Sequence, residues 1–446
     1  MNKNKSYVVP IIMMILLFGM ISFVTNLAAP MGVVLKSQFG ASNFQGMMGN
    51  AMNFIGYAIM GIPGGLLLQR VGYKKTALIA IAFGFVGVGI QYLAGHTGQD
   101  AAFSVYLIGA LVAGFSMTLL NTVVNPMLNT LGGEGNKGHQ LIQVGGSFNS
   151  IMATFTPAFV GILIGEAAKS QISDIFPVMY IAMGIFALVG LVLLFVNIPE
   201  PNLDAAKEPM KNLMTGALKF RHFVFGAIAI FVYVGVEIGV PGTMMLWLSD
   251  PAAGMGAAGV AGSIAGTYWL LMLVGRLTGV AIGGKISSKV MLTVTSSLGI
   301  LLVLAAIFLP TSITVNMLGF QTSGGVLTFG FAEVPINAML FVLVGLCTSI
   351  MWGSIFNLAV EGLGKYLAAA SGIFMTMVVG GGLLPLLQNA VADAAGFMAS
   401  YWVIVAGLGY LFFYAAIGSK VTQRADDVSI EDKTVIGAAE AEASKK

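Results

Sequence analysis

The sequence contains few of the residue combinations that enzymes use for catalysis. Its three histidines, at positions 96, 139 and 222, are widely separated and form no HExxH motif. The single cysteine, Cys347, excludes an internal disulfide, a thiolate metal cluster and a CxxC redox pair. Neither paired carboxylates nor a nucleophile beside a base can be recognised. We therefore expect no enzymatic activity, no metal site and no cofactor.

Amide and hydroxyl side chains, in contrast, recur at helical spacing inside apolar stretches of the first half of the chain. They are Thr25 and Asn26 in 8–35, Asn50, Asn53 and Tyr57 in 44–69, Asn121, Asn125 and Asn129 in 101–131, and Gln143, Ser147 and Asn149 in 140–166. Residues at i, i+4 and i+8 share one face of a helix. Because lipid offers no hydrogen-bond partner, these faces should point to a bundle interior or a wet cavity.

Two readings of these polar faces stay open for any single residue. Each amide could simply join neighbouring helices, a contact worth about 0.6 to 2 kcal/mol. The set as a whole favours ligand binding, because it concentrates on four stretches of one half. Amides, hydroxyls and aromatic rings suit a neutral polyhydroxylated solute, and this half offers no buried counter-charge for a charged one.

The second half adds two carboxylates at helical spacing from another polar residue. Tyr233 and Glu237 are an i, i+4 pair, and so are Asn357 and Glu361. Glu237 lies deep in an apolar stretch, where an isolated charge costs several kcal/mol. It could be a proton or cation site, a sugar hydroxyl acceptor, or a structural partner of a residue such as Arg276. Glu361 precedes a glycine-rich turn, so a gating or loop contact is favoured there.

The composition requires that the elements carrying these residues span a membrane. The 446 residues are 57% hydrophobic and only 9% charged, with a net charge of +3, whereas soluble domains are about 25% charged. This excludes a water-soluble enzyme, and the charge is too small to indicate a nucleic-acid partner. Twelve apolar stretches are long enough to cross a bilayer. They are 8–35, 44–69, 76–94, 101–131, 140–166, 175–198, 222–248, 258–284, 289–309, 337–362, 366–392 and 398–419.

The distribution of basic residues predicts the orientation of these spans. With the N-terminus inside, the inner side carries 18 of the 21 Lys and Arg residues, whereas the outer side carries only Lys36 and Lys169, and Arg276 lies within a span. We therefore expect both termini in the cytoplasm and the protein in a bacterial-type inner (plasma) membrane, as a monomer. The apolar segment 310–336, broken by Gly and Pro, is expected to be an ordered loop on the membrane surface, with a re-entrant segment as the alternative.

The chain divides into two halves of six spans. The polar segment 199–221 predicts a cytoplasmic linker between a bundle at 1–198 and a second bundle at 222–419, and 420–446 is expected to be a disordered tail. The fold class expected is therefore an all-α membrane protein of twelve transmembrane helices. Two six-span halves are typical of transporters that work by alternating access around a site near the midplane.

Several motifs resemble one transporter family. The loop GLLLQRVGYKK at 65–75, which contains Arg70, resembles the loop signature GxxxDRxGRK of the major facilitator superfamily, with Gln69 where Asp is usual. Residues 43–75, 121–126, 138–150, 233–239, 275–276 and 348–388 resemble the fucose/glucose/galactose proton-symporter family. The words EGLGKY and GGxxxPLLQ in the last segment are the most diagnostic. The resemblance implies the fold of the superfamily, a sugar substrate, alternating access and proton coupling.

The departures from this family concern the coupling residues. Where relatives of the fucose symporter carry a carboxylate four residues before the proline of span one, this chain has Asn26. Where they carry a second carboxylate in span four, it has Asn121. An amide can bind a sugar hydroxyl but cannot titrate, so the usual proton relay cannot use these two positions.

We therefore expect a sugar transporter with a cavity between the halves. The candidate binding residues are Asn26, Asn53, Asn121, Asn125, Gln143, Asn149, Tyr233, Glu237 and Asn357. Glu237 is the candidate for coupling to a proton or sodium ion, and Arg70, Arg276 and Glu361 are candidates for gating or structural contacts. A transporter of another neutral solute, an uncoupled sugar uniporter and a non-transporting sensor are the alternatives.

Overall fold

The structure is a computed structural model that describes residues 7–132, 137–198, 200, 210–282, 286–323 and 326–423. The predicted tail after residue 423 lies outside the described residues. The first half contains α1 (Val8–Phe39), α2 (Asn43–Gly46), α3 (Met48–Ala94), α4 (Gln99–Gly132), α5 (Lys137–Ile164), the 3-10 turns η1 (Ala167–Lys169) and η2 (Ile172–Ile175), and α6 (Phe176–Phe195). A short helix, α7 (Met210–Ala217), lies in the predicted linker.

The second half contains more helices, because several of its spans are interrupted. It consists of α8 (Arg221–Ser249), α9 (Ala258–Ile282), α10 (Ser288–Phe308), the strands β1 (Thr314–Ser323) and β2 (Val326–Pro335), α11 (Ile336–Thr348), α12 (Met351–Val360), η4 (Gly364–Tyr366), α13 (Leu367–Met377), α14 (Gly380–Ala395), α15 (Phe397–Ser400), α16 (Trp402–Phe413) and the π-turn η5 (Tyr414–Gly418). The membrane part is helical throughout the described residues, as expected.

Eleven helical segments of the described chain are long and apolar enough to span a membrane. One of them, α3, is long enough for two spans. Helix α3 has 47 residues, and Gly72 within it has the non-helical angles φ 85° and ψ 173°. Gly56 before this point and Gly87 after it both pack against the same place on α4, at Gly114 and Ala113. The two arms of α3 are therefore folded back on each other, and counting them separately gives the twelve spans expected.

The turn at Gly72 is closed by a carboxylate from the start of the linker. Glu200 accepts hydrogen bonds from the backbone N–H groups of Tyr73 (2.7 Å) and Lys74 (3.1 Å). These are the unpaired N–H groups that begin the second arm, so Glu200 acts as its cap. A side chain at position 72 would collide with this carboxylate, and its positive φ also favours glycine.

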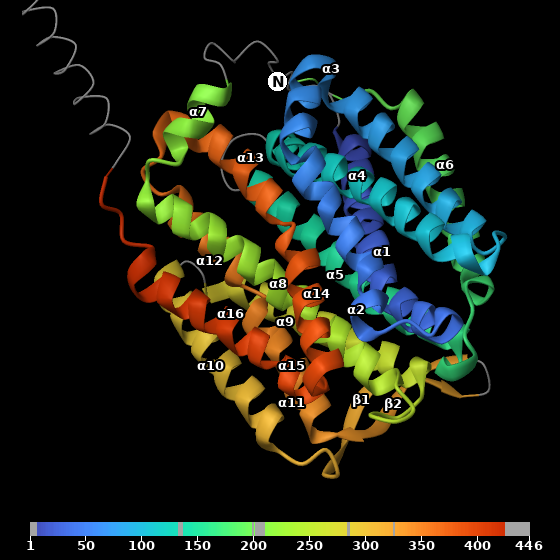
Figure 1. Cartoon of the computed structure of the whole chain (residues 1–446). Helices are drawn as coiled ribbons and strands as arrows, with labels where there is room; N and C mark the ends of the chain where they lie inside the picture. The colour runs from blue at the N-terminus through green and yellow to red at the C-terminus, as the bar shows by residue number, and fades with distance from the viewer. Residues whose placement is uncertain are drawn as a thin grey trace, which may run out of the picture.

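The helices form two bundles that lie side by side (Figure 1). Helix α5 of the first bundle packs on α9 of the second, and α3 packs on α13 and α14. Helix α7 marks one end of the molecule, called the linker end here, whereas α2 and the strands mark the opposite hairpin end (Figure 1). Close approach of α5 and α9 depends on glycine, because a Cβ on Gly262 would lie 2.2 Å from the carbonyl oxygen of Pro157.

The segment 310–336 forms a β-hairpin, which was not expected. Strands β1 and β2 are antiparallel, with Leu318 opposite Phe331 and Val315 opposite Val334. One face buries Met317 and Val334, and the other exposes Leu318 and Phe331. The described residues of this segment thus include two regular strands, where an ordered loop or a re-entrant path was expected.

Candidate functional site: a polar pocket between the bundles

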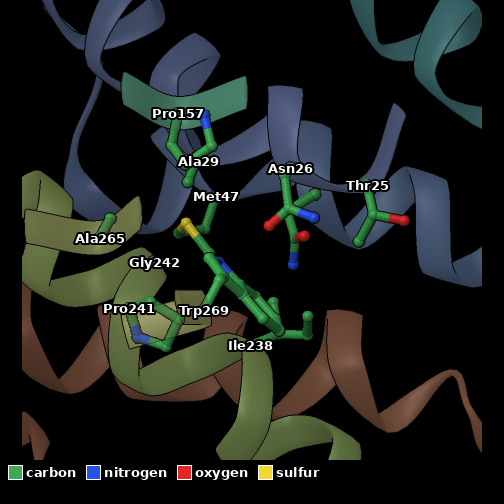
Figure 2. Close-up of a pocket in the computed structure, with 11 residues that line it drawn as sticks. Thr25, Asn26, Ala29, Met47, Pro157, Ile238, Pro241, Gly242, Ala265 and Trp269 are labelled. Atoms are coloured by element: carbon green, nitrogen blue, oxygen red, sulfur yellow. The ribbon is translucent and has the colours of Figure 1, made fainter. Parts of the chain in front are cut away.

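A pocket lies between the two bundles, with residues of both in its wall. It is lined by Thr25, Asn26, Ala29, Met47, Asn50 and Pro157 from the first bundle and by Ile238, Pro241, Gly242, Ala265 and Trp269 from the second. Figure 2 shows Thr25 and Asn26 on one side, Ile238 and Pro241 on the other, and the Trp269 ring between them. The pocket therefore combines amide and hydroxyl groups with a large aromatic surface.

Asn26 is held in this wall by its own helix. Its amide nitrogen donates to the carbonyl oxygen of Ser22 at 2.9 Å and approaches the Ser22 hydroxyl at 3.3 Å. The Ser22 hydroxyl in turn donates to the carbonyl oxygen of Asn149 on α5 at 2.6 Å. This chain of bonds fixes the orientation of the amide, which is what recognition of a polar ligand requires.

Prolines interrupt the helical hydrogen bonding in the helices that line the pocket. Pro157 and Pro241 line it, and Pro30 follows Asn26 by four residues. A proline has no N–H, so the carbonyl group four residues earlier loses its helical donor. The carbonyls of Asn26, Ala153 and Glu237 are in this situation, and each belongs to the helical turn that reaches the pocket.

A partly buried ion pair lies on the linker side of the pocket. The Nη2 atom of Arg276 on α9 lies 3.4 Å from Oε1 of Glu237 on α8. Its Nη1 atom donates to the hydroxyl of Ser150 on α5 at 3.1 Å and approaches the carbonyl oxygen of Gly146 at 3.5 Å. Of the three roles open to Glu237, the geometry thus supplies the Arg276 partner. Because Arg276 also bonds to α5, the ion pair is tied to both bundles.

The ion pair and the pocket lie along the same helix faces. Glu237 precedes the pocket residue Pro241 by four residues, Ser150 precedes Pro157 by seven, and Arg276 follows Trp269 by seven. Such spacings return to one face of a helix after one or two turns. The ion pair is therefore about one to two turns nearer the linker end, on the same central axis.

Three of the other predicted residues make hydrogen bonds inside the first bundle, two of them between helices. Asn121 donates to the hydroxyl of Tyr57 on α3 at 2.5 Å, and Asn125 donates to the carbonyl oxygen of Asn121 at 3.2 Å. Asn149 donates to the carbonyl oxygen of Phe18 on α1 at 3.1 Å. Asn53 is buried, and its Oδ1 atom has no hydrogen-bond partner among the described residues. These four residues do not line the pocket in this conformation.

The remaining candidates lie elsewhere. Tyr233 is fully buried one turn before Glu237. Asn357 on α12 is exposed and does not line the pocket, and the side chain of Gln143 lies outside the described part of the chain. The carbonyl oxygen of Glu361 accepts a hydrogen bond from His222 at 2.8 Å, and Arg70 is exposed near the turn of α3.

The pocket also contains functional candidates that the sequence analysis missed. Trp269 is the largest of them, and Met47, Pro157 and Ala265 complete the wall. One signal was available for Trp269, because it precedes Arg276 by seven residues and so shares the face of that polar residue. Met47, Pro157 and Ala265 carry no polar group that could have distinguished them from other residues of the spans.

Two helical bundles with spans long enough to cross a membrane, and a pocket between them, are the architecture of membrane transporters of the alternating-access class. Comparison with known protein families supports this class, because the profile of the Major Facilitator Superfamily matches residues 11–384. The chain belongs to this superfamily.

Its relatives include sugar transporters of bacteria. A glucose/galactose transporter of Brucella abortus is 30% identical over 94% of this chain and 96% of its own length. A putative glucose/galactose transporter of Helicobacter pylori is 28% identical over 91% of this chain and 95% of its own. The crystal structure of the Escherichia coli fucose:proton symporter is similar with a TM-score of 0.65 and 21% identity, covering 94% of this chain and 100% of that one. The last likeness shows the fold.

Proposed function

We propose that this protein carries a neutral monosaccharide, a hexose or a related sugar, across the bacterial inner membrane into the cell. The observation that carries the proposal is the pocket between the bundles, whose wall includes Asn26, Asn50 and Trp269. Amides both donate and accept hydrogen bonds, as sugar hydroxyls require, and an aromatic ring packs against the apolar face of a sugar ring.

The relatives support a sugar as the substrate class. Two curated relatives are named for glucose and galactose, and a more distant one, the L-fucose-proton symporter of Escherichia coli, is 22% identical over 89% of this chain. The chemistry of the lining agrees with this class, because the wall includes Asn26 and Thr25 as polar groups and no acidic or basic side chain. A neutral solute would leave no charge unpaired there.

We place the linker end in the cytoplasm. The chain carries 18 of its 21 basic residues in segments assigned to that side. At the hairpin end, Lys36 and Lys169 each have an acidic partner, Asp250 at 3.1 Å and Glu166 at 2.7 Å. Both termini are then cytoplasmic, and the hairpin faces outward.

Cation coupling, if present, is assigned to Glu237. Asn26 and Asn121 cannot take up a proton, whereas Glu237 is buried, paired with Arg276 and close to the pocket. A proton on Glu237 would release Arg276, whose bond to Ser150 joins the two bundles. Occupancy of one site would thereby change the contact between the bundles, as coupled transport requires.

The test is uptake of labelled glucose or galactose into proteoliposomes, with a proton gradient and a sodium gradient imposed separately. We expect saturable uptake that the other hexose inhibits. In Glu237→Gln, concentrative uptake should be lost while counterflow of the sugar continues, because exchange needs no net movement of protons. Unchanged accumulation in this variant would reject Glu237 as the coupling residue.

An uncoupled uniporter is the second candidate, favoured by the two amides at the family's carboxylate positions. Its uptake should not respond to either gradient. A panel of neutral solutes, including amino sugars and glycosides, tests the substrate class by competition. If the protein binds the sugar but no flux is observed, the result would indicate a sensor instead of a transporter.

A further inference from the structure

The bundles are joined at the hairpin end by charged residues that lie outside the pocket. The carboxylate of Asp393, at the end of α14, accepts the backbone N–H groups of Asn43 and Phe44, both at 2.8 Å. These residues begin α2 in the other bundle. The ammonium group of Lys36, at the end of α1, lies 3.1 Å from Asp250, which directly follows α8.

Lys36 connects these two contacts into one cluster. Its ammonium group also donates to Oδ1 of Asn43 at 2.5 Å and lies 5.5 Å from the centre of the Phe397 ring. Two first-bundle elements, α1 and α2, therefore contact three second-bundle segments: the end of α14, the residue after α8 and the start of α15. Lys36 follows Asn26 by ten residues on α1, which places the cluster about 15 Å from the pocket toward the hairpin end.

A second layer of contacts lies between this cluster and the pocket. The Asn50 amide of α3 donates to the carbonyl oxygen of Gly381 on α14 at 2.8 Å. That carbonyl lacks its helical donor because Pro385 has no N–H. Gly382 allows α3 to approach closely, since a Cβ there would lie 2.9 Å from the Cα of Ala51. Asn50 also lines the pocket, so this residue belongs both to the pocket wall and to the contact between α3 and α14.

We propose that Asp393, Lys36 and Asp250 form the outer gate of the transport cycle: they hold the outward side closed and must separate before the pocket opens to the outside. The proposal rests on the alternating-access function proposed above. Three of these contacts cross between the bundles at the mouth of their interface: Asp393 with the two N–H groups of α2, and Lys36 with Asp250. The bond from Lys36 to Asn43 lies within the first bundle. Breaking the crossing contacts removes free energy from the outward-closed state, which shifts the population toward the outward-open state.

The experiment measures access to the pocket from each side of the membrane. Cys347, the single native cysteine, is buried and is replaced by alanine. The pocket residue Ala29 is then changed to cysteine as the reporter. A charged, membrane-impermeant thiol reagent is applied to right-side-out vesicles and, separately, to inside-out vesicles, and the initial labelling rates are compared.

We expect Asp393→Ala and Lys36→Met each to raise the labelling rate from outside by about threefold or more, and the double variant by about tenfold, the range for partly exposed charge contacts. The rate from inside should fall, because the two states exclude each other. Asp100→Asn is the matched control, an acidic residue at the hairpin end in the first turn of α4, and it should leave both rates unchanged.

Equal labelling rates in all variants would overturn the gate, and so would a rise from both sides, which would indicate general loosening. Labelling needs no sugar, so the gate can be judged even if sugar uptake fails. If the rates shift as expected and no sugar is carried, the gate is supported and the proposed substrate is rejected. If sugar is carried and the rates do not shift, the gate is rejected and the proposed function is kept.

Discussion

The ion pair between Glu237 and Arg276 should have a measurable coupling energy. The two side chains are 11% and 25% exposed, and their closest charged atoms are 3.4 Å apart. At this distance the Coulomb energy is about 5 kcal/mol for an effective dielectric constant of 20 and about 1 kcal/mol in water. Because both groups retain some exposure and the distance is long for an ion pair, we expect a coupling energy of about 2 kcal/mol.

A double-mutant cycle measures this quantity. Arg276→Met leaves the Glu237 carboxylate without its counter-charge and removes the bond to Ser150, so it should cost about 3 kcal/mol. Glu237→Gln should cost less, because Arg276 keeps Ser150 and some contact with solvent. The double variant should be about 2 kcal/mol more stable than the sum of the single changes predicts. Unfolding in mixed micelles titrated with dodecyl sulfate provides the free energies.

The exposed pair Lys169 and Glu166 is the matched control. Its atoms are closer, at 2.7 Å, but its side chains are 76% and 62% exposed. Water should reduce its coupling energy to below about 0.5 kcal/mol despite the shorter distance. If the buried pair were equally weakly coupled, Glu237 and Arg276 would act independently, and the reasoning that links the carboxylate to the contact between bundles would be refuted.

Three further predictions concern the pocket, the packing and the gate. Trp269→Ala should raise the KM of sugar counterflow about tenfold, and Trp269→Phe less, because the ring supplies the apolar surface of the site; an unchanged KM would exclude it from the site. Gly114→Ala should destabilise the protein by about 1 to 3 kcal/mol in the same micelle titration, because the added Cβ would lie 2.2 Å from the carbonyl oxygen of Asn53; wild-type stability would show that the helices can separate there at no cost. Burial raises the pKa of Asp250, but the backbone N–H groups of Ala252 and Ala253 and the Lys36 ammonium outweigh it and hold that pKa below its ordinary value. The stability difference between wild type and Asp250→Asn should therefore be constant at neutral pH and disappear as the pH falls below about 4, the ordinary range of Asp; a loss already near pH 6 would contradict this assignment.

Much of the fold was predictable because only long apolar segments of the chain can span the lipid bilayer. Long apolar stretches predicted the spans, and the polar segment 199–221 between the sixth and seventh of them led us to expect two halves. The two-armed α3 follows from the same pattern, since basic residues and Gly72 separate its arms. The hairpin at 310–336 was not predictable in this way, because its Gly and Pro residues disguise the alternation that its strands show, with Met317 buried and Leu318 exposed.

The sequence predicts which residues share one face of a helix, and the candidate site was predictable only to that extent. Asn26 was predicted from its place near the middle of the first span and from the family's carboxylate position, and this residue lines the pocket. Spacing cannot show which neighbour covers a face, so Asn121 was a binding candidate although it bonds Tyr57 within its own bundle. Asn357 was chosen in the same way and is exposed. Trp269 was missed because a single aromatic residue in an apolar span resembles ordinary core.

The cap that Glu200 places on α3 has a consequence for how far the bundles can move apart. Glu200 is bonded to the first bundle, and α7, which begins at Met210, packs on α13 of the second. Ten residues of chain connect these two attachment points, and a fully extended chain covers at most about 3.3 to 3.6 Å per residue. The linker is therefore a tether of about 35 Å at most, and this length sets the upper limit for separation of the two attachment points during transport.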